Sequence, residues 1–315
     1  MSINKAASFT AADSIPVKLF LQEGVSDLQP IHIQWIPTNR CNLNCDFCSC
    51  SNRDHSLEMD PAIAQMVIAD FARLGCKAVT ITGGGEPLCH KHLADMIQGF
   101  YYHRISVGLV TNGLLFDKLD RDTIERLTWC RISNHDRREF TDVYRRILER
   151  VVEIDSVDWA FSHVVSTDPN IQEIRRIVQF ANEHDLTHVR LVSDLFCPEK
   201  VDQFWVKESL QGIDERVVYQ PRQNAKRGGK CWIGYVKPLI GPDWSITPCC
   251  GCQYALDPPT RDLPRSMIIG DARELDRMYG GERTAWRFPC VRCYYNNYND
   301  ILDAMQSDVM HKEFI

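Results

Sequence analysis

The sequence predicts an α/β fold, namely a partial (β/α)6 TIM-like barrel followed by a small C-terminal domain. Two observations predict it. From about Ile31 to about Leu210, short β-branched or aromatic runs alternate with longer segments of helical period, which is the pattern of β-α units around a parallel sheet. Near residue 215 this alternation stops, and short apolar runs and clustered cysteines follow. We therefore expect one large unit and one smaller unit.

The large unit contains six candidate strands with helices between them. In the first helical segment, Asp60 followed by Pro61 is typical of an N-cap and first helical position, and Gly75 ends the pattern. The six expected strands are Ile31–Ile36, Ala78–Thr82, Ile105–Val110, Arg131–Ser133, Trp159–Val165 and Val189–Val192.

The C-terminal part begins with a polar segment, Tyr219–Lys230, that we interpret as a connection. Two apolar runs, Tyr235–Ile240 and Trp244–Thr247, predict a hairpin, and short helices are expected near Asp271 and Asn299. The expected division is an N-terminal extension at 1–30, a barrel core at 31–214 and a C-terminal domain at 215–315.

Composition limits the class of protein. The chain has 315 residues, 36 Lys and Arg against 42 Asp and Glu, and 14 cysteines. The net charge of −6 weighs against nucleic-acid binding. No secretory signal and no membrane-spanning run is evident, so we expect a cytoplasmic protein without a membrane partner. In a reducing compartment, cysteines bind metal or do chemistry more often than they form disulfides.

The first cysteine set is the CxxxCxxC of Cys41, Cys45 and Cys48, directly after the first expected strand. Thiolates are soft ligands suited to zinc or iron–sulfur clusters, and a four-iron cluster normally takes four of them. Three ligands leave one iron free to bind another molecule. The alternative is a structural zinc site completed by Cys50 or by a distant Cys or His.

CxxxCxxC with Phe47 before its third cysteine, after the first strand of a β-α chain, resembles the radical S-adenosylmethionine (SAM) superfamily. Gly83, Gly84, Gly85 and Glu86, followed by Pro87, resemble that family's GGEP motif, whose glycines approach the methionine amine of SAM. Glycine allows such close approach because it has no Cβ, and a carboxylate can accept from the charged amine. The resemblance implies a [4Fe–4S] cluster held by the three cysteines, with SAM bound to it.

The same resemblance assigns further SAM contacts. Thr111-Asn112-Gly113 matches a common turn, and Ser133 matches a serine that contacts the ribose or carboxylate of SAM. Two positions later the family often has an acidic residue, whereas this chain has His135. Arg145 or Arg146 stands where an arginine often pairs with the SAM carboxylate; the alternative is a surface arginine.

The second cysteine set lies in the C-terminal part. Its order of one cysteine, a hairpin ending in Pro-Cys and a later CxxC resembles the SPASM/Twitch extension, which carries auxiliary four-iron clusters. No cysteine follows Cys293, so the count favours the shorter Twitch form with one auxiliary [4Fe–4S] cluster. Cys250 or Cys252 could replace Cys249, and a four-thiolate zinc is the alternative. The expected ligands are Cys231, Cys249, Cys290 and Cys293.

The resemblance implies an enzyme that reductively cleaves SAM to a 5′-deoxyadenosyl radical, which abstracts hydrogen from a substrate. Only about 30 residues precede the first strand, so we favour oxidation or rearrangement of a small polar metabolite over maturation of a ribosomal peptide. A zinc-stabilised binding protein is the alternative from another class. An electron donor such as flavodoxin or ferredoxin is the expected partner. Asp194 and Glu199 are candidate proton acceptors by position alone.

Overall fold

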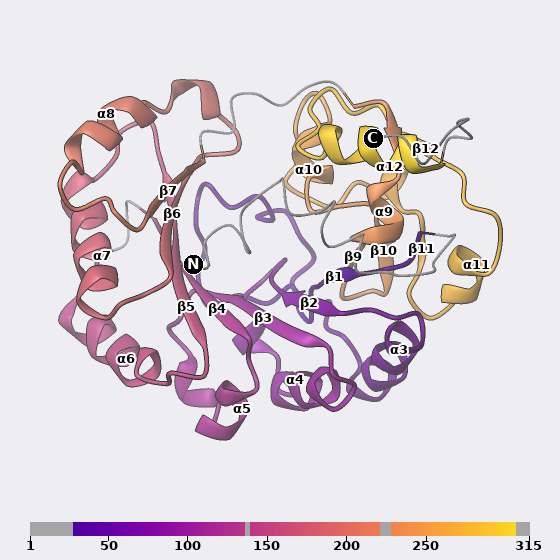
Figure 1. The fold of residues 1–315 in the computed structure, drawn as a ribbon, viewed down its shortest axis with the longest axis horizontal. Helices are drawn as coiled ribbons and strands as arrows, with labels where there is room; N and C mark the ends of the chain where they lie inside the picture. Colours follow the sequence, from indigo (N-terminus) through magenta and orange to yellow (C-terminus); the bar gives the residue numbers. More distant parts are fainter. Residues whose placement is uncertain (1–27, 136–138, 221–227, 307–315) are drawn as a thin grey trace, which may run out of the picture.

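A seven-stranded parallel sheet forms the larger part of the molecule. The computed structural model describes residues 28–135, 139–220 and 228–306. The strands lie in chain order, each hydrogen-bonded to the next, and curve around the concave side seen in Figure 1. They are β1 (His32–Trp35), β2 (Ala78–Ile81), β3 (Ser106–Thr111), β4 (Trp129–His135), β5 (Asp158–Val165), β6 (His188–Ser193) and β7 (Val217–Gln220).

Helices cover the convex face of this sheet (Figure 1). The first begins as the sequence predicts, because the Asp60 carboxylate accepts from the backbone N–H groups of Ala62 and Ile63 with Pro61 at the first helical position. Gly75, at φ 87°, turns the chain after it. The outer helices are α3 (Pro61–Arg73), α4 (Leu93–Tyr102), α5 (Arg121–Glu125), α6 (Asp142–Val152), α7 (Ile171–Glu183) and α8 (Gln203–Ser209).

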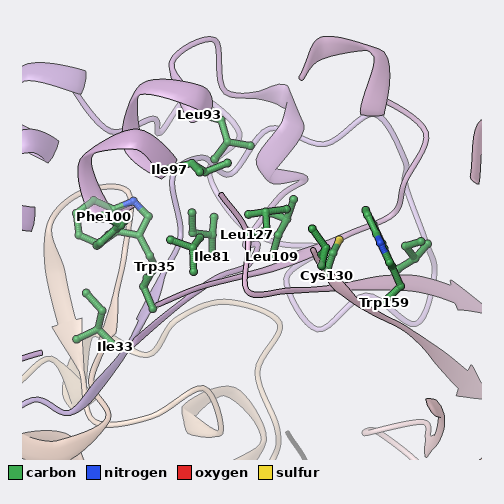
Figure 2. Packing of buried hydrophobic residues seen from close by; sticks show 14 of the residues in the cluster. Ile33, Trp35, Ile81, Leu93, Ile97, Phe100, Leu109, Leu127, Cys130 and Trp159 are labelled. Carbon is green, nitrogen blue, oxygen red and sulfur yellow. The ribbon is translucent and has the colours of Figure 1, made fainter. Parts of the chain in front are cut away.

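The hydrophobic core lies between the sheet and these helices. Figure 2 shows Trp35 of β1 against Phe100 of α4, with the ring centroids 5.4 Å apart and the planes 88° apart. Such edge-to-face pairs add to the stabilisation from burial. The ring centroid of Trp244, from the C-terminal part, lies 6.1 Å from that of Trp35. The core therefore joins the two parts of the chain.

The C-terminal part extends the same sheet beyond β1. Strand β9 (Leu239–Ile240) pairs parallel with β1, and β10 (Ser245–Thr247) and β11 (Gly270–Asp271) follow in antiparallel order. A separate pair joins β8 (Lys230–Cys231) to β12 (Trp286–Arg287). The helices here are α9 (Ile233–Val236), α10 (Cys252–Ala255), α11 (Leu275–Tyr279) and α12 (Asn296–Gln306).

The expected α/β fold with its partial barrel is confirmed, and all six expected strands are present. Two local expectations were wrong. The polar connection was expected from Tyr219, yet β7 continues to Gln220 because Val217, Val218 and Tyr219 pair with β6. The first hairpin run was expected from Tyr235, which instead lies in α9. The division at 214/215 stays a prediction.

Candidate active site

The first cysteine set lies on the loop after β1, at the carboxyl edge of the parallel sheet. Cys41, Cys45 and Cys48 are all partly exposed there. The backbone N–H of Cys48 donates to the carbonyl of Cys45 at 3.1 Å, so these two residues are held in one turn. A bridge between Thr38 and Glu58 closes the base of the loop. The carboxyl edge is where parallel α/β sheets bind their ligands.

Backbone and side-chain donors point at the sulfur atoms of this set. The N–H of Leu43 donates to Cys41 Sγ at 3.4 Å, and the N–H of Cys50 donates to Cys48 Sγ at 3.4 Å. The guanidinium of Arg53 donates to the same Cys48 sulfur at 3.4 Å. Burial raises the pKa of Cys41, and the Leu43 N–H opposes this rise. Donors of this kind favour the thiolate form that binds metal.

The glycine segment after β2 packs directly on the chain that enters the cysteine loop. A Cβ on Gly84 would lie 2.1 Å from Asn39 Oδ1, and a Cβ on Gly85 would lie 1.9 Å from the Arg40 carbonyl oxygen. On Gly83 it would lie 1.5 Å from the Gly85 carbonyl oxygen. Real Cβ atoms do not approach this closely, so a side chain at position 84 or 85 would displace the chain that enters the cysteine loop. The structure thus brings the glycine motif and the first cysteine set together.

Glu86 is buried at the ends of β2 and β3, with 3% of its surface exposed. Its carboxylate accepts from the Thr111 hydroxyl at 2.5 Å and from the Asn112 N–H at 2.7 Å. The Asn112 side chain in turn donates to Asn42 Oδ1 at 2.8 Å. Glu86 therefore ties the turn after β3 to the cysteine loop.

Two polar residues at the end of β4 lie beside the same loop. The Ser133 hydroxyl donates to the carbonyl of Thr111 at 3.2 Å. Nε2 of His135 lies 3.8 Å from Cys45 Sγ, and its ring centroid lies 4.7 Å from that of Phe47. His135, which stands where the related pattern has an acidic residue, is thus in contact with the cysteine loop.

Arg145 is not brought together with the other predicted SAM contacts. It lies on α6, where its guanidinium pairs with Glu149 at 2.8 Å and with Glu183 of α7 at 2.6 Å. These carboxylates raise its pKa, and its charge also lies over the ring of Phe180. Arg146 is exposed on the same helix. Arg145 therefore joins two outer helices.

A pocket opens between the cysteine loop and the carboxyl ends of β4, β5 and β6. Asp194, one of the two candidate proton acceptors, lines it, and Glu199 lies exposed on the next turn. The pocket combines two carboxylates, two basic side chains, a hydroxyl and two apolar groups. Its lining residues are Asp46, Phe47, His135, Val164, Ser166, Asp194 and Arg261.

The second cysteine set surrounds another pocket in the C-terminal part. The four expected ligands, which come from β8, the end of β10 and the chain before α12, all line it: Cys231, Cys249, Cys290 and Cys293. Gly228 also lines it, and a Cβ there would lie 2.9 Å from the Cys290 Cβ. Asn299 places its amide 4.0 Å from Cys293 Sγ.

The thiols of the second set hold their protons strongly. Burial, followed by the charges of Cys249 and Cys293, raises the pKa of Cys290 to about 12. Burial also raises the pKa of Cys231 and of Cys293, and a hydrogen bond with Cys252 raises that of Cys249. Metal ligands must be deprotonated, so a bound cation would have to displace these protons.

Cys250 and Cys252, the two substitutes for Cys249, make further contacts, and the Cys252 sulfur also lies 4.0 Å from the Cys249 sulfur. The Cys250 sulfur lies 3.3 Å from the Tyr295 hydroxyl. The Cys252 thiol is buried and donates to the Cys249 carbonyl at 3.0 Å. Of the three, Cys249 is the one that lines the second pocket.

The spacing and the chemistry of the sulfur atoms in the two cysteine sets indicate which metal group they can bind. In the part of the chain that the structure describes, no three His, Cys, Asp or Glu side chains converge closely enough to bind one metal ion. The four thiols of the second set instead line a shared pocket. Soft thiolate donors, three in one set and four in the other, fit iron–sulfur clusters.

Comparison with known families decides the nature of the larger part. Residues 35–176, from the end of β1 into α7, match the model of the Radical SAM superfamily. This part of the chain is a radical SAM domain. The match contains Cys41, Cys45, Cys48 and the glycine segment. Membership implies a [4Fe–4S] cluster and SAM.

Similar proteins include enzymes named for one nucleotide reaction. A GTP 3′,8-cyclase of Syntrophomonas wolfei is 24% identical over 238 residues, which are 64% of this chain and 71% of that protein. A probable GTP 3′,8-cyclase of Pyrococcus abyssi is 25% identical over 158 residues, 46% of this chain and 51% of that protein. The chain therefore spans about half the length of the second relative.

A solved structure shares the fold. Streptococcus suis SuiB bound to the precursor peptide SuiA superposes with a TM-score of 0.58 at 14% identity. The superposition covers 88% of this chain and 73% of SuiB. At this identity the likeness concerns the fold alone. Among the described residues, no helix is both long and apolar enough to cross a bilayer.

Sequence reasoning missed the contacts that the C-terminal part makes with the radical SAM domain. Arg261 donates to the carbonyls of Asp46 and Cys48, each at 2.8 Å, and stacks over the ring of Phe196 at 4.1 Å. Gln253 donates to Ser49 O at 3.0 Å. The three hydrogen bonds join residues more than 200 positions apart in the sequence, so no local pattern could have indicated them.

Proposed function

We propose that this chain is a radical SAM enzyme that binds its [4Fe–4S] cluster at Cys41, Cys45 and Cys48 and acts on a small polar substrate. The single observation that carries the proposal is the meeting of this cysteine triplet with the glycine segment beside a polar pocket. When bound, cluster and SAM supply reductive cleavage of SAM to a 5′-deoxyadenosyl radical that abstracts hydrogen from the substrate.

The residues around the triplet hold and shield this chemistry. Gly84 and Gly85 let the segment after β2 pack directly on Asn39 and Arg40 at the start of the cysteine loop, and Ser133 offers a hydroxyl at the end of β4. Glu86 keeps the turn after β3 against the loop. Arg145 is left out of the proposed SAM contacts because its guanidinium is used by two carboxylates on the outer helices.

The pocket favours a small polar metabolite. Phe47 and Val164 provide apolar walls that exclude water, and Arg261 and His135 can hold anionic or hydroxyl groups. Asp194 can accept a proton from substrate at the ends of β5 and β6. Oxidation would follow if an electron and a proton both leave the substrate after hydrogen abstraction.

We further propose that Cys231, Cys249, Cys290 and Cys293 hold an auxiliary [4Fe–4S] cluster in a Twitch-type domain. Four thiols lining one pocket support this proposal. Such a cluster would serve as the acceptor of the substrate's electron, which makes the enzyme an oxidoreductase. A flavodoxin or ferredoxin is the proposed donor of the electron that starts each turnover.

Two other substrate classes are the competing candidates. The relatives named GTP 3′,8-cyclase favour a nucleotide, but the carboxylates of Asp46 and Asp194 offset the two basic side chains of the pocket, which therefore lacks the excess positive charge that a triphosphate requires. The fold shared with peptide-bound SuiB favours a ribosomal peptide, and a neighbouring gene for a short precursor would support that class.

The test is anaerobic reconstitution of the full chain, followed by incubation with SAM and dithionite. We expect 5′-deoxyadenosine and methionine, with about eight irons and little zinc per chain. The matched control is Cys48→Ala, which should yield neither product. Absence of cleavage by wild type with both clusters intact would overturn the enzyme proposal, and one or two zincs without a brown chromophore would establish the zinc-binding alternative.

A further inference from the structure

Arg53 is a buried arginine directed at the first cysteine set. It follows Cys48 by five residues, and 8% of its surface is exposed. Its Nε donates to the Asn39 carbonyl at 2.7 Å, which fixes the plane of the guanidinium. Its Nη1 donates to Cys48 Sγ at 3.4 Å and also to the Cys50 carbonyl. Two backbone carbonyls therefore hold the guanidinium in place while it donates to the Cys48 sulfur.

Among the residues that the structure describes, no carboxylate pairs with the charge of Arg53. Within residues 28–135, 139–220 and 228–306, its hydrogen-bond acceptors are two carbonyls and the Cys48 sulfur. Arg40, at the start of the same loop, instead pairs with Glu58 and is about half exposed. A buried cation without a counter-charge is strongly destabilising. The acceptor of Arg53 that can become negative is the Cys48 sulfur.

The Arg53 guanidinium lies within hydrogen-bond distance of the Cys48 sulfur, so its charge favours negative charge at that atom. Reduction of a cluster by one electron adds one unit of negative charge at the same place.

We propose that Arg53 is a positioning residue that holds the Cys48 sulfur and raises the reduction potential of the cluster bound by the triplet. The inference rests on the first cluster of the proposed function. Net charge, hydrogen bonds to sulfur and solvent exposure set such potentials, and Arg53 supplies a positive charge and a hydrogen bond to sulfur. One electron enters from the low-potential donor, no bond changes, and the fixed cation stabilises the reduced form more than the oxidised form.

The experiment compares three variants of the reconstituted full chain. Arg53→Gln removes the charge, Arg53→Lys retains it without the planar fork, and Arg40→Gln removes a nearby arginine that already has a carboxylate partner. The readout is the midpoint potential of the first cluster, followed by the EPR signal that responds to SAM. Iron content and circular dichroism report whether cluster and fold are intact.

We expect a more negative midpoint potential in Arg53→Gln, a smaller shift in Arg53→Lys and none in Arg40→Gln. Assembly of the cluster in Arg53→Lys but not in Arg53→Gln would also support the charge requirement. An unchanged potential in Arg53→Gln, equal shifts in both Arg53 variants, or loss of the cluster from both folded variants would overturn the inference. Failure of wild type to form a cluster at the triplet would instead overturn the proposed function.

Discussion

Cys48 and Cys290 belong to two cysteine sets that the protein surrounds differently. The Cys48 sulfur receives an N–H and a guanidinium and lies on a loop beside an open polar pocket. Cys290 lies in a pocket with three other thiols, and burial and their charges raise its pKa. Hydrogen-bond donors face the Cys48 sulfur, whereas the Cys290 thiol lies among other thiols whose charges oppose its deprotonation.

This difference teaches how one chain can host two sites of the same ligand type. Three sulfurs on a supported loop leave room for a further ligand, which suits binding of SAM. Four sulfurs from separate segments close around their pocket, which suits a site that exchanges electrons. Four experiments test this comparison: the first compares the two sets directly, and each of the other three tests one of them.

The largest contrast is in SAM cleavage. Cys48→Ala should abolish 5′-deoxyadenosine formation, because the triplet has no spare ligand, and should leave about half of the iron. The double variant Cys290→Ala, Cys293→Ala should also lose about half of the iron but retain cleavage of SAM. Product analysis with iron determination measures both effects. Cleavage of SAM by Cys48→Ala would contradict the assignment of the triplet as the SAM-cleaving site. Loss of SAM cleavage from the double variant, while the EPR signal of the triplet's cluster is intact, would also contradict it.

The motifs that carry this contrast were predictable from the sequence because they are local. Cys41 to Cys48 lie within eight residues after one strand, and Gly83 to Glu86 follow the next strand. Parallel strands bring such loops to one edge. The strand order and the α3 cap followed from the same kind of short-range pattern.

The remaining features of the fold and the site depend on long-range contacts or on the ion-pair partners of a side chain. Arg145 was placed by position, although Glu149 four residues later already indicated an ion pair on the helix surface. The end of strand β7 overlaps the segment Tyr219–Lys230, whose mostly polar composition predicts a connection rather than a strand. Arg53 resembled an ordinary loop arginine, because its burial comes from packing that no spacing reveals.

The second contrast is in thiol reactivity of the metal-free chain. Because the pKa of Cys290 is about 12, the fraction of Cys290 in the thiolate form at pH 8.5 is about a thousandth of that of an ordinary cysteine. Its alkylation by iodoacetamide should be at least about a hundredfold slower than that of free cysteine and should rise about tenfold per pH unit from 8 to 10. Mass spectrometry of the modified peptide measures the rate. A plateau above pH 9 would show that the thiol is not protected by burial.

The third contrast concerns the loop itself. Arg261→Gln removes two hydrogen bonds from a charged donor to the Asp46 and Cys48 carbonyls. Loss of about 1.5 kcal/mol of loop stability should let a chelator remove the first cluster about tenfold faster. Decay of the SAM-responsive EPR signal measures the rate. Arg265→Gln, at an exposed position in the same segment, is the control, and equal rates in both variants would contradict the role of Arg261.

The smallest contrast separates three neighbouring cysteines. Cys249→Ser should halve the bound iron, because Cys249 lines the second pocket with the other three thiols. Cys250→Ser and Cys252→Ser should keep it, since the Cys250 sulfur contacts Tyr295 and the Cys252 thiol donates to a carbonyl. Iron analysis of the three variants, prepared in parallel, gives the result. Loss of iron from Cys252→Ser with retention in Cys249→Ser would move the ligand by three residues, to the first residue of α10, whose sulfur lies 4.0 Å from that of Cys249.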